Sequence, residues 1–234
     1  MKILVTAGST RTMIDQVRCI TNIFQGRTGH TIAEHFASLG DDVHLLTSNI
    51  SNFNYAFNTE GVRPYKFRTF DDLYLKMMKL VEAHDYDVII HSAAVSDYKV
   101  DGTYIDQSQD GSTEFDLEEI KNSDKISSDH KELFLKLIPT VKIVDQIRGW
   151  GFKGKLVKFK LQVDMSDYDL ICIAKASREH SDADIIVANC LEWSRDRAFI
   201  ITEQVVEEVS REDLAKRLYE KCSSNDEEKR KDGR

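Results

Sequence analysis

The chain opens with KILVTAGSTR at residues 2–11, and it continues through IDQVRCITN at 14–22 and GRTGHTIAEHFA at 26–37. The first stretch is an apolar run of strand-forming residues that breaks at a loop of small residues, and the third has the periodicity of a helix. A second short apolar strand follows at 42–47, after a turn at Gly40 and Asp41. Together these segments are typical of the first β-α-β unit of a nucleotide-binding sheet.

The alternation of strands and helices continues to the end of the chain. Strands are predicted at 62–67, 86–91, 156–163 and 184–188, and a hairpin at 197–209. Helices are predicted at 70–83, 141–148, 169–179 and 211–222. We therefore expect an α/β fold with a doubly wound, mostly parallel, Rossmann-like sheet, helices on both faces, and ligands outside the carboxyl ends of the strands. The strand at 156–163 alternates polar and apolar residues, which indicates burial on one face only.

One long segment interrupts this pattern. Between residues 92 and 129 the periodicity is lost in a run rich in Asp, Ser, Gly and Gln, and so long a loop in a compact domain is usually a lid, an interface segment or disordered. We expect a single nucleotide-binding domain at 1–222, whose loop at about 99–124 closes over the site or reaches a partner subunit. The charged residues 223–234 are predicted to form a disordered tail.

Composition argues against several classes of function. The 234 residues carry a net charge of −8, which disfavours nucleic acid and anionic membranes as partners, because both reward clustered Lys and Arg. No apolar segment of about 18 residues could span a bilayer, and the start lacks a signal-peptide pattern. The four cysteines show no metal-binding or redox spacing. A cytoplasmic protein that acts on small molecules is the resulting expectation.

The opening loop distinguishes between kinds of nucleotide site. It reads Gly8-Ser9-Thr10-Arg11, without the Gly-x-Gly-x-x-Gly spacing of dinucleotide-binding folds, and residues 47–49 include no acidic residue for a ribose hydroxyl. No tyrosine has a lysine four positions later, the spacing that short-chain dehydrogenases use, and no Walker loop is present. The Gly26-x-x-Gly29 pair would either open a helix whose N–H groups bind phosphate or carboxylate, or allow close packing.

Several short motifs occur together in one order along the chain. They are TAGSTR at 6–11, ID, VR and ITN within 14–22, Gly26-x-x-Gly29, AAVSDY at 93–98, KISS at 125–128, KFKL at 158–161 and VAN at 187–189. In this order they resemble the phosphopantothenate–cysteine ligase family of coenzyme A biosynthesis, over residues 2 to about 202. Bifunctional members of that family also carry a flavin-dependent decarboxylase half, which is missing from this sequence, so the resemblance implies a free-standing ligase.

The resemblance implies a reaction in two steps. The carboxylate of 4′-phosphopantothenate attacks the α-phosphate of CTP or ATP to give an acyl-nucleotidyl intermediate and pyrophosphate, and the amine of L-cysteine then displaces the nucleotide. Negative charge develops on phosphoryl or carbonyl oxygens in both steps, so fixed donors and cations should dominate catalysis. Mg²⁺ as a cofactor and a homodimeric assembly are implied by the same resemblance.

The resemblance also assigns roles to individual residues. The catalytic set is Asn22, Arg18 and Lys125, with Lys121 as the alternative lysine because the alignment crosses the long polar segment. The nucleotide-binding residues are Gly8, Ser9, Thr10, Asp97, Phe159 and Asn189, and Asp97 is also the candidate Mg²⁺ contact. The substrate-binding residues are Arg18, Asn22, Gly26, Gly29, Ala93 and Ala94. Amide, guanidinium and ammonium groups are donors suited to the reacting oxygens.

Departures from the family pattern leave the nucleotide open. Gly8-Ser9-Thr10 stands where the family usually has Gly-Gly-Thr, and Arg27 replaces a common lysine. The KFKL motif is closer to the free-standing ligases, some of which use ATP, than to the bifunctional CTP users. Two other classes of function are kept as alternatives: an NAD(P)-dependent oxidoreductase of Rossmann type, and a non-catalytic nucleotide-sensing module.

Overall fold

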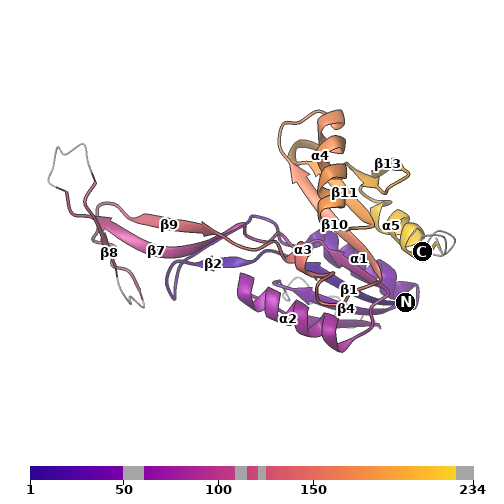
Figure 1. Ribbon diagram of the computed structural model, residues 1–234, viewed down its shortest axis with the longest axis horizontal. Helices are drawn as coiled ribbons and strands as arrows, with labels where there is room; N and C mark the ends of the chain where they lie inside the picture. The colour runs from indigo at the N-terminus through magenta and orange to yellow at the C-terminus, as the bar shows by residue number, and fades with distance from the viewer. Residues whose placement is uncertain (50–60, 109–114, 121–124, 225–234) are drawn as a thin grey trace.

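The computed structural model describes residues 1–49, 61–108, 115–120 and 125–224. Its body is built on one sheet with the strand order β13-β12-β11-β10-β6-β1-β4-β5 (Figure 1). Neighbouring strands from β11 to β5 pair in parallel, and β12 pairs antiparallel with both β11 and β13. The strands are β1 (Lys2–Ala7), β4 (Asp42–Thr47), β5 (Val62–Lys66), β6 (Val88–His91), β10 (Lys155–Gln162), β11 (Ile185–Cys190), β12 (Arg197–Ile201) and β13 (Val206–Ser210).

Helices cover both faces of this sheet, as Figure 1 shows. Successive residues of β1 alternate between the two layers: Ile3 and Val5 belong to the apolar cluster of α1, whereas Leu4 packs with α2. The doubly wound, mostly parallel fold expected from the sequence is confirmed. One face carries α1 (Arg27–Ser38) and α5 (Leu214–Ser223), and the other carries α2 (Phe70–Ala83), α3 (Ile143–Gln146) and α4 (Asp167–His180).

The prediction for the strand at 156–163 is wrong in one respect. β10 lies inside the sheet between β6 and β11, and Leu156 and Val157, which point to opposite faces, are both fully buried. Lys158 is only 7% exposed and donates from Nζ to the carbonyl oxygen of Ser177 (2.9 Å) near the end of α4. Its charge therefore faces helix carbonyl groups rather than water. In the sequence pattern such a lysine looks like a solvent-facing residue.

An arm of antiparallel strands projects from the body (Figure 1). It consists of β7 (Tyr98–Asp106), β8 (Leu117–Glu119) and β9 (Phe134–Pro139), and the hairpin of β2 (Arg11–Met13) and β3 (Cys19–Thr21) lies along its base. In the described part of the loop expected at about 99–124, residues 99–106 and 117–119 are thus corrected to paired strands, and the lid or interface role stays a prediction. Strands of the arm bury few apolar side chains, so they lack the period of two that identifies a half-buried strand.

Further expectations concern the later part of the chain. The helix predicted at 141–148 is a single turn, α3, although Ile143 and Ile147 are buried as expected. The predicted hairpin is confirmed as β12 and β13. Lys121 and most of the tail at 223–234 lie outside the described residues. Within the part of the chain that is described, no helix is both long and apolar enough to cross a membrane.

Candidate functional site

The carboxyl ends of β1 and β6 meet where the strand order reverses. From β1 the chain passes through α1 to β4 on one side, whereas β6 leads towards β10 on the other. The loops after β1 and β6 are joined by backbone hydrogen bonds, from Ala94 N to Gly8 O (2.8 Å) and from Thr10 N to Ala94 O (3.3 Å). Doubly wound sheets bind ligands at such a reversal, so these two loops form the floor of the candidate site.

Ser9 and Thr10, two predicted phosphate-binding residues, are buried. The Ser9 backbone N–H donates to Ser48 Oγ (2.9 Å), and the Ser9 hydroxyl donates to the carbonyl oxygen of Phe24. The Thr10 hydroxyl accepts the N–H of Ser96 (2.8 Å). These polar groups hold the loop in place. Ser48 and Ser96 are therefore supporting residues that the motif analysis missed.

Two glycines let α1 start directly against the end of β1. Gly26 has a left-handed backbone (φ +82°), and a Cβ there would lie 2.7 Å from Gly8 Cα. A Cβ on Gly29 would lie 2.5 Å from Ser92 Oγ and 2.7 Å from Ala7 Cβ. The Gly26-x-x-Gly29 spacing therefore serves close packing, one of the two explanations that the sequence leaves open. The same packing brings the N–H groups of α1 to the floor of the site, as the other explanation requires.

The start of α1 presents donors that the helix itself cannot satisfy. Its N-cap residue is Gly26, no side chain caps the first turn, and the first turn contains no acidic residue. The first N–H groups of a helix have no partner within it, and the helix dipole makes this end positive. Arg27 adds a further positive charge. An anion such as a phosphate or a carboxylate would satisfy these groups.

Asn22 lies beside the floor of the site. Its Nδ2 donates to the carbonyl oxygen of Ala94 (3.2 Å), and the residue stays exposed. The preceding Thr21 donates its hydroxyl to the carbonyl oxygen of Thr10 (3.0 Å). These two bonds attach the end of the β2–β3 hairpin to both loops. The structure thus brings the predicted residues Asn22, Ala93 and Ala94 together.

The loop after β6 is also fixed by a hydrogen bond to the side chain of Thr6 in β1. The Thr6 hydroxyl accepts the Ala93 N–H (3.2 Å) and lies 2.9 Å from Nδ1 of His91. Burial lowers the pKa of His91 to about 4, so the imidazole is neutral at pH 7. The neutral pair of Thr6 and His91 therefore fixes Ala93 without adding positive charge near the start of α1.

Asp15 and Arg18 bind the backbone of Ile126, the residue after Lys125, and both Arg18 and Lys125 are predicted to be catalytic. Arg18 donates from Nε (2.9 Å) and Nη2 (2.6 Å) to Asp15 Oδ2, and from Nη2 to the carbonyl oxygen of Ile126 (2.6 Å). The Ile126 N–H donates to the same Asp15 oxygen (3.2 Å). The hydrogen bond from Arg18 is the main reason that the pKa of the Asp15 carboxyl lies well below its usual range. Lys125, the neighbour of Ile126, is thereby anchored beside the β2–β3 hairpin.

The sequence analysis gave Asp15 no role, although one signal for it was present. Asp15 precedes Arg18 by three residues, and its side chain is fully buried, whereas that of Arg18 is 40% exposed. Ile126 is 111 residues away, and no local pattern connects it with the hairpin. Since Lys121 is outside the described residues, the anchoring is described for Lys125 alone.

Asp97, the predicted Mg²⁺ contact, is exposed and forms an ion pair with Lys142. Its carbonyl oxygen accepts the N–H of Thr140 (2.9 Å), which ties the loop after β6 to the end of β9. Among the described residues, no group of three or more His, Cys, Asp or Glu side chains could hold a metal ion. A single exposed carboxylate fits Mg²⁺ when substrate phosphates supply further ligands. Lys142, to which the motif analysis gave no role, is thus a cation beside Asp97.

Phe159 and Asn189, predicted to bind the nucleotide, lie in neighbouring strands near the carboxyl edge of the sheet. Phe159 of β10 pairs in register with Val187 of β11, and both belong to the apolar layer that contains α1. Asn189 follows Val187 by two residues and therefore lies on the same face. Both predicted residues thus share the face of the sheet that α1 covers. β6 separates them from β1.

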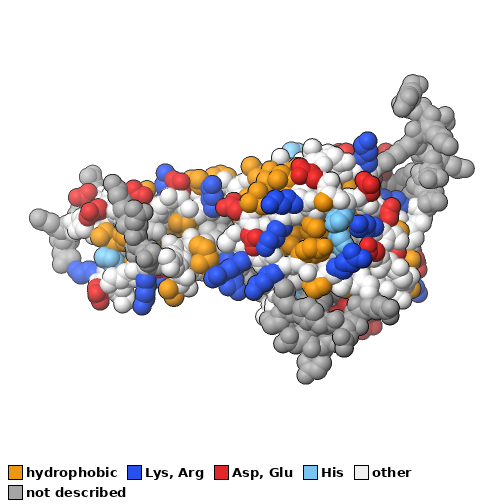
Figure 2. Space-filling view, turned by 90° about the horizontal axis from the view of Figure 1, so that it is seen from below, with side chains coloured by type: hydrophobic (Ala, Val, Ile, Leu, Met, Phe, Trp, Pro, Cys, Tyr) orange, Lys and Arg blue, Asp and Glu red, His pale blue; other side chains and the backbone are white. Residues whose placement is uncertain are grey.

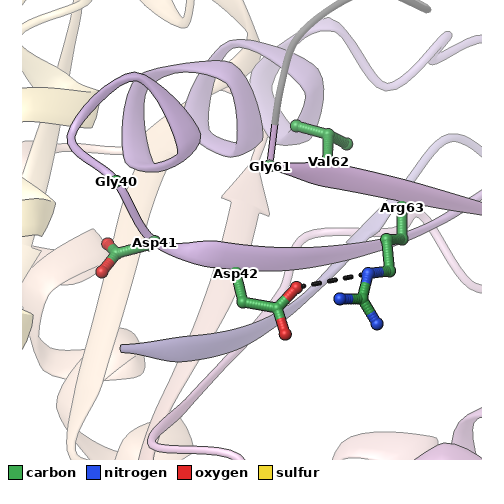
Figure 3. Close-up of a pocket in the computed structure, with 6 residues that line it drawn as sticks. All are labelled: Gly40, Asp41, Asp42, Gly61, Val62 and Arg63. Atoms are coloured by element: carbon green, nitrogen blue, oxygen red, sulfur yellow. Dashed lines mark ion pairs between the residues drawn. The ribbon is translucent and has the colours of Figure 1, made fainter.

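A shallow hollow lies at the opposite end of β4 (Figure 3). It is formed by the turn before β4 and the start of β5, and the ion pair between Asp42 and Arg63 (3.5 Å) crosses it. The candidate residues gather instead at the carboxyl ends of the strands, where β4 finishes at Thr47. The hollow is therefore separate from the candidate site.

Comparison with known proteins identifies the family of the chain. The family model described as "DNA/pantothenate metabolism flavoprotein C-terminal domain" matches residues 1–225. The chain belongs to this family. The coenzyme A biosynthesis bifunctional protein CoaBC of Thermococcus kodakarensis is 32% identical to it over 217 residues, which cover 93% of this chain and 46% of the relative. The corresponding protein of Methanocaldococcus jannaschii is 29% identical over 227 residues, covering 94% and 50%.

Solved structures are also similar to this chain. The DNA/pantothenate metabolism flavoprotein from Streptococcus pneumoniae has a TM-score of 0.78 at 34% identity, over 94% of this chain and 97% of that one. A Cab2 variant in complex with phosphopantothenate-cysteine has a TM-score of 0.69 at 13% identity, over 94% and 86%, and it shares the fold. The resemblance to the coenzyme A family is confirmed. The chain spans about half the length of the curated relatives it matches.

Proposed function

We propose that this chain is a phosphopantothenate–cysteine ligase. The observation that carries the proposal is the meeting of Asn22 with the loops after β1 and β6, beside the uncapped start of α1, in a chain of this family. The curated relatives are named as coenzyme A biosynthesis bifunctional proteins, and a structure with the same fold holds phosphopantothenate-cysteine. The latter name contains the two groups that the proposed reaction would join.

In the proposed reaction, a carboxylate oxygen of 4′-phosphopantothenate attacks the α-phosphorus of a nucleoside triphosphate, and pyrophosphate leaves. The amine of L-cysteine then attacks the acyl carbon, loses a proton, and displaces the nucleoside monophosphate to form the amide. In both transition states negative charge grows on phosphoryl or carbonyl oxygens. Donors held in place at the edge of the sheet would stabilise that charge without having to reorganise.

Three side chains would act on these oxygens. Asn22 is held by Ala94 through one amide hydrogen, so its second amide N–H can donate to the acyl oxygen. Lys125 would bring a point charge to the leaving phosphates. Arg18 is already bonded to Asp15 and to the segment of Lys125, so we assign it the placement of Lys125 as well as contact with the substrate.

The nucleotide, CTP or ATP, would lie along the carboxyl edge of the sheet on the face of α1. Phe159 and Asn189 would contact the base and ribose, and Gly8 and the first turn of α1 the phosphates. Ala93 and Ala94 would let the substrates approach the backbone closely. Gly26 and Gly29 would contribute through the packing that brings the N–H groups of α1 to the substrates. Asp97 would hold Mg²⁺ together with the phosphates, whose charge the ion would offset.

We also propose that the arm forms an interface between two copies of the chain. Large apolar side chains are exposed along it and on the neighbouring hairpin, among them Val17, Ile20, Tyr98, Leu117 and Leu137. Figure 2 shows apolar patches among charged side chains on both the arm and the body. A second copy would cover such patches. Light scattering should report a dimer, and a monomer at micromolar concentration would contradict this assignment. A cytoplasmic location stays a prediction.

Release of pyrophosphate tests the ligase function. We expect release that depends on 4′-phosphopantothenate with either CTP or ATP, and amide product only when L-cysteine is present. If neither nucleotide supports release, the proposal is wrong. Thermal stabilisation by NADPH, and not by CTP or ATP, would point to an oxidoreductase. Nucleotide binding without turnover would point to a sensing module.

The substitution Asn22→Asp should separate the two half-reactions. It removes the amide donor and places a negative charge beside Ala94, so amide formation should fall by about 100-fold, the size of effect seen when one oxyanion donor is removed. The acyl-nucleotide, detected by mass spectrometry before L-cysteine is added, should still form. Gln204→Glu makes the same chemical change in the exposed turn between β12 and β13 and should leave both steps unaltered. Unchanged amide formation in N22D would refute the role of Asn22.

A further inference from the structure

Arg211 lies at the ligand edge of the sheet, although it is remote from the site in sequence. It follows β13, whose last residue Ser210 pairs with Arg197 at the start of β12. β12 begins at the carboxyl end of β11, where Phe199 pairs with Ala188. The turn that carries Arg211 therefore opens at the same edge as the start of α1. α5, which follows this turn, packs in the same layer as α1.

The Arg211 guanidinium reaches the first turn of α1. Its Nη2 donates to Thr28 Oγ1. Its Nη1 is buried and has no hydrogen-bond partner within the part of the chain that the structure describes. A guanidinium carries five N–H donors and keeps its charge in proteins, so a nitrogen that is enclosed and unpaired costs free energy.

Other arginines at this end of the chain have counter-charges. Arg197 pairs with Asp167 (2.9 Å) and Glu208 (3.0 Å), and Arg217 of α5 pairs with Glu207 (2.5 Å). Burial lowers the pKa of Arg211. Among the residues that the structure describes, carboxylates pair with the neighbouring arginines and none pairs with this side chain.

The surroundings make the unpaired charge of Arg211 more costly. The start of α1 is the positive end of a helix dipole, it has no acidic residue in its first turn, and it includes Arg27. Charge repulsion and desolvation therefore both act against a cation beside Thr28. A bound phosphoryl group would reverse both effects, because its negative charge would offset that of the guanidinium and its oxygens can accept from the free N–H groups of the first turn.

We propose that Arg211 binds a phosphoryl oxygen of an anionic substrate held at the first turn of α1. The proposal rests on the ligase function proposed above and adds a recognition residue to the same site. Two substrates carry the required group, the nucleoside triphosphate and 4′-phosphopantothenate, and separate binding measurements distinguish them. The turn before α5 is thereby part of the site.

Calorimetric titration of the full chain with CTP, ATP, 4′-phosphopantothenate and inorganic pyrophosphate tests this assignment. Arg211→Gln should weaken the binding of at least one of these anions by about tenfold or more, as expected for loss of a charge-assisted hydrogen bond. Its melting temperature without ligand should not fall, because an unpaired buried charge is removed. A purely structural role would lower that melting temperature and leave the affinities unchanged. The matched control is Arg217→Gln, which removes a paired arginine from α5 and should leave every affinity unchanged.

The outcomes separate this proposal from the ligase function. If R211Q binds every anion within about twofold of the wild type, well under the tenfold step of 1.4 kcal/mol, the assignment is wrong. If the wild type binds none of the four, it is wrong as well. If pyrophosphate binding depends on Arg211 while no nucleotide supports pyrophosphate release, the anion site stands and the ligase function fails. Should R211Q not fold, Arg211→Lys keeps the charge without the planar fork. A loss of about threefold or more in R211K would support the assignment, and a smaller change would overturn it.

Discussion

Three helices of the body differ in how their first turns are capped. α2 begins after Thr69, whose hydroxyl accepts the N–H of Asp72 (3.2 Å), and α4 begins after Ser166, which caps Asp169 in the same way (3.1 Å). Both have two acidic residues in the first turn. α1 begins at Gly26, with no capping side chain and no acidic residue. Capping and acidic residues stabilise a helix, so the chain itself stabilises the starts of α2 and α4, whereas the start of α1, where a ligand is expected, has neither.

The largest effect is expected from a substitution at Gly26, the residue that begins α1. Gly26→Ala would add a Cβ 2.7 Å from Gly8 Cα in a left-handed backbone, so we expect a loss of about 3 kcal/mol or more in the free energy of unfolding and loss of ligase activity. Gly40→Ala is the control, since Gly40 has φ +91° and nothing within 4 Å of the new Cβ. Equal losses in urea titrations of the two variants would show that the contact between α1 and β1 contributes nothing beyond backbone strain.

Adding the missing acidic residue should remove the difference between α1 and the other two helices. Thr28→Asp gives Arg211 a carboxylate and complements the helix dipole, so the unfolding free energy should rise by about 0.5–1 kcal/mol. The same charge should weaken binding of the phosphoryl substrate by about tenfold or more, a difference of about 1.4 kcal/mol. Thr31→Asp places the charge further along α1 at an exposed position and serves as the control. Undiminished affinity in T28D would argue that no anion binds at this end of α1.

His30, in the first part of α1, should make the stability of the protein depend on pH. Burial lowers the pKa of His30 to about 4, below its value in the unfolded chain, so the unfolded state binds more protons between pH 6.5 and 4. The contribution of neutral His30 to stability is therefore fully present above about pH 6.5 and is lost as pH drops towards 4. His30→Gln should reduce this fall by up to about 2 kcal/mol. His130→Gln changes an exposed histidine, and if both variants keep the full pH dependence, His30 does not contribute to it.

A substitution at a capped helix start should affect stability alone. Ser166→Ala removes the hydroxyl that accepts the Asp169 N–H at the start of α4, and a cap of this kind contributes about 1 kcal/mol. The unfolding free energy should fall by that amount, while the affinities for nucleotide and 4′-phosphopantothenate stay at wild-type values. A changed affinity in this variant would mean that the start of α4 is coupled to the site.

The strands and helices of the body could be predicted because their burial leaves a periodic pattern in the sequence. β1, its loop and α1 were identified from residues 2–37, and the structure confirms the doubly wound sheet around them. The arm could not be predicted, since exposed strands such as β7 leave no such pattern. The same is true of Lys158, whose burial depends on the carbonyl groups at the end of α4.

Parts of the site were missed for a related reason. Asn22 and Ala94 belong to motifs that can be recognised locally, and the structure joins them. The role of Asp15 depends on its contact with Ile126, 111 residues away, and that of Arg211 on its contact with Thr28, 183 residues away. Contacts over such distances are set by the fold and leave no local signal in either partner.

The central place of β1 also has a consequence for synthesis of the protein. β1 is made before its partner strands in the sheet, and Val5 pairs with Leu45 of β4, 40 residues later, but with Ile90 of β6, 85 residues later. Until β6 emerges, one edge of an almost wholly apolar strand has no partner, and such edges promote aggregation. The pairing of Gly8 with Ala94 is completed only then. The growing chain is therefore most vulnerable during the interval in which its candidate site does not yet exist.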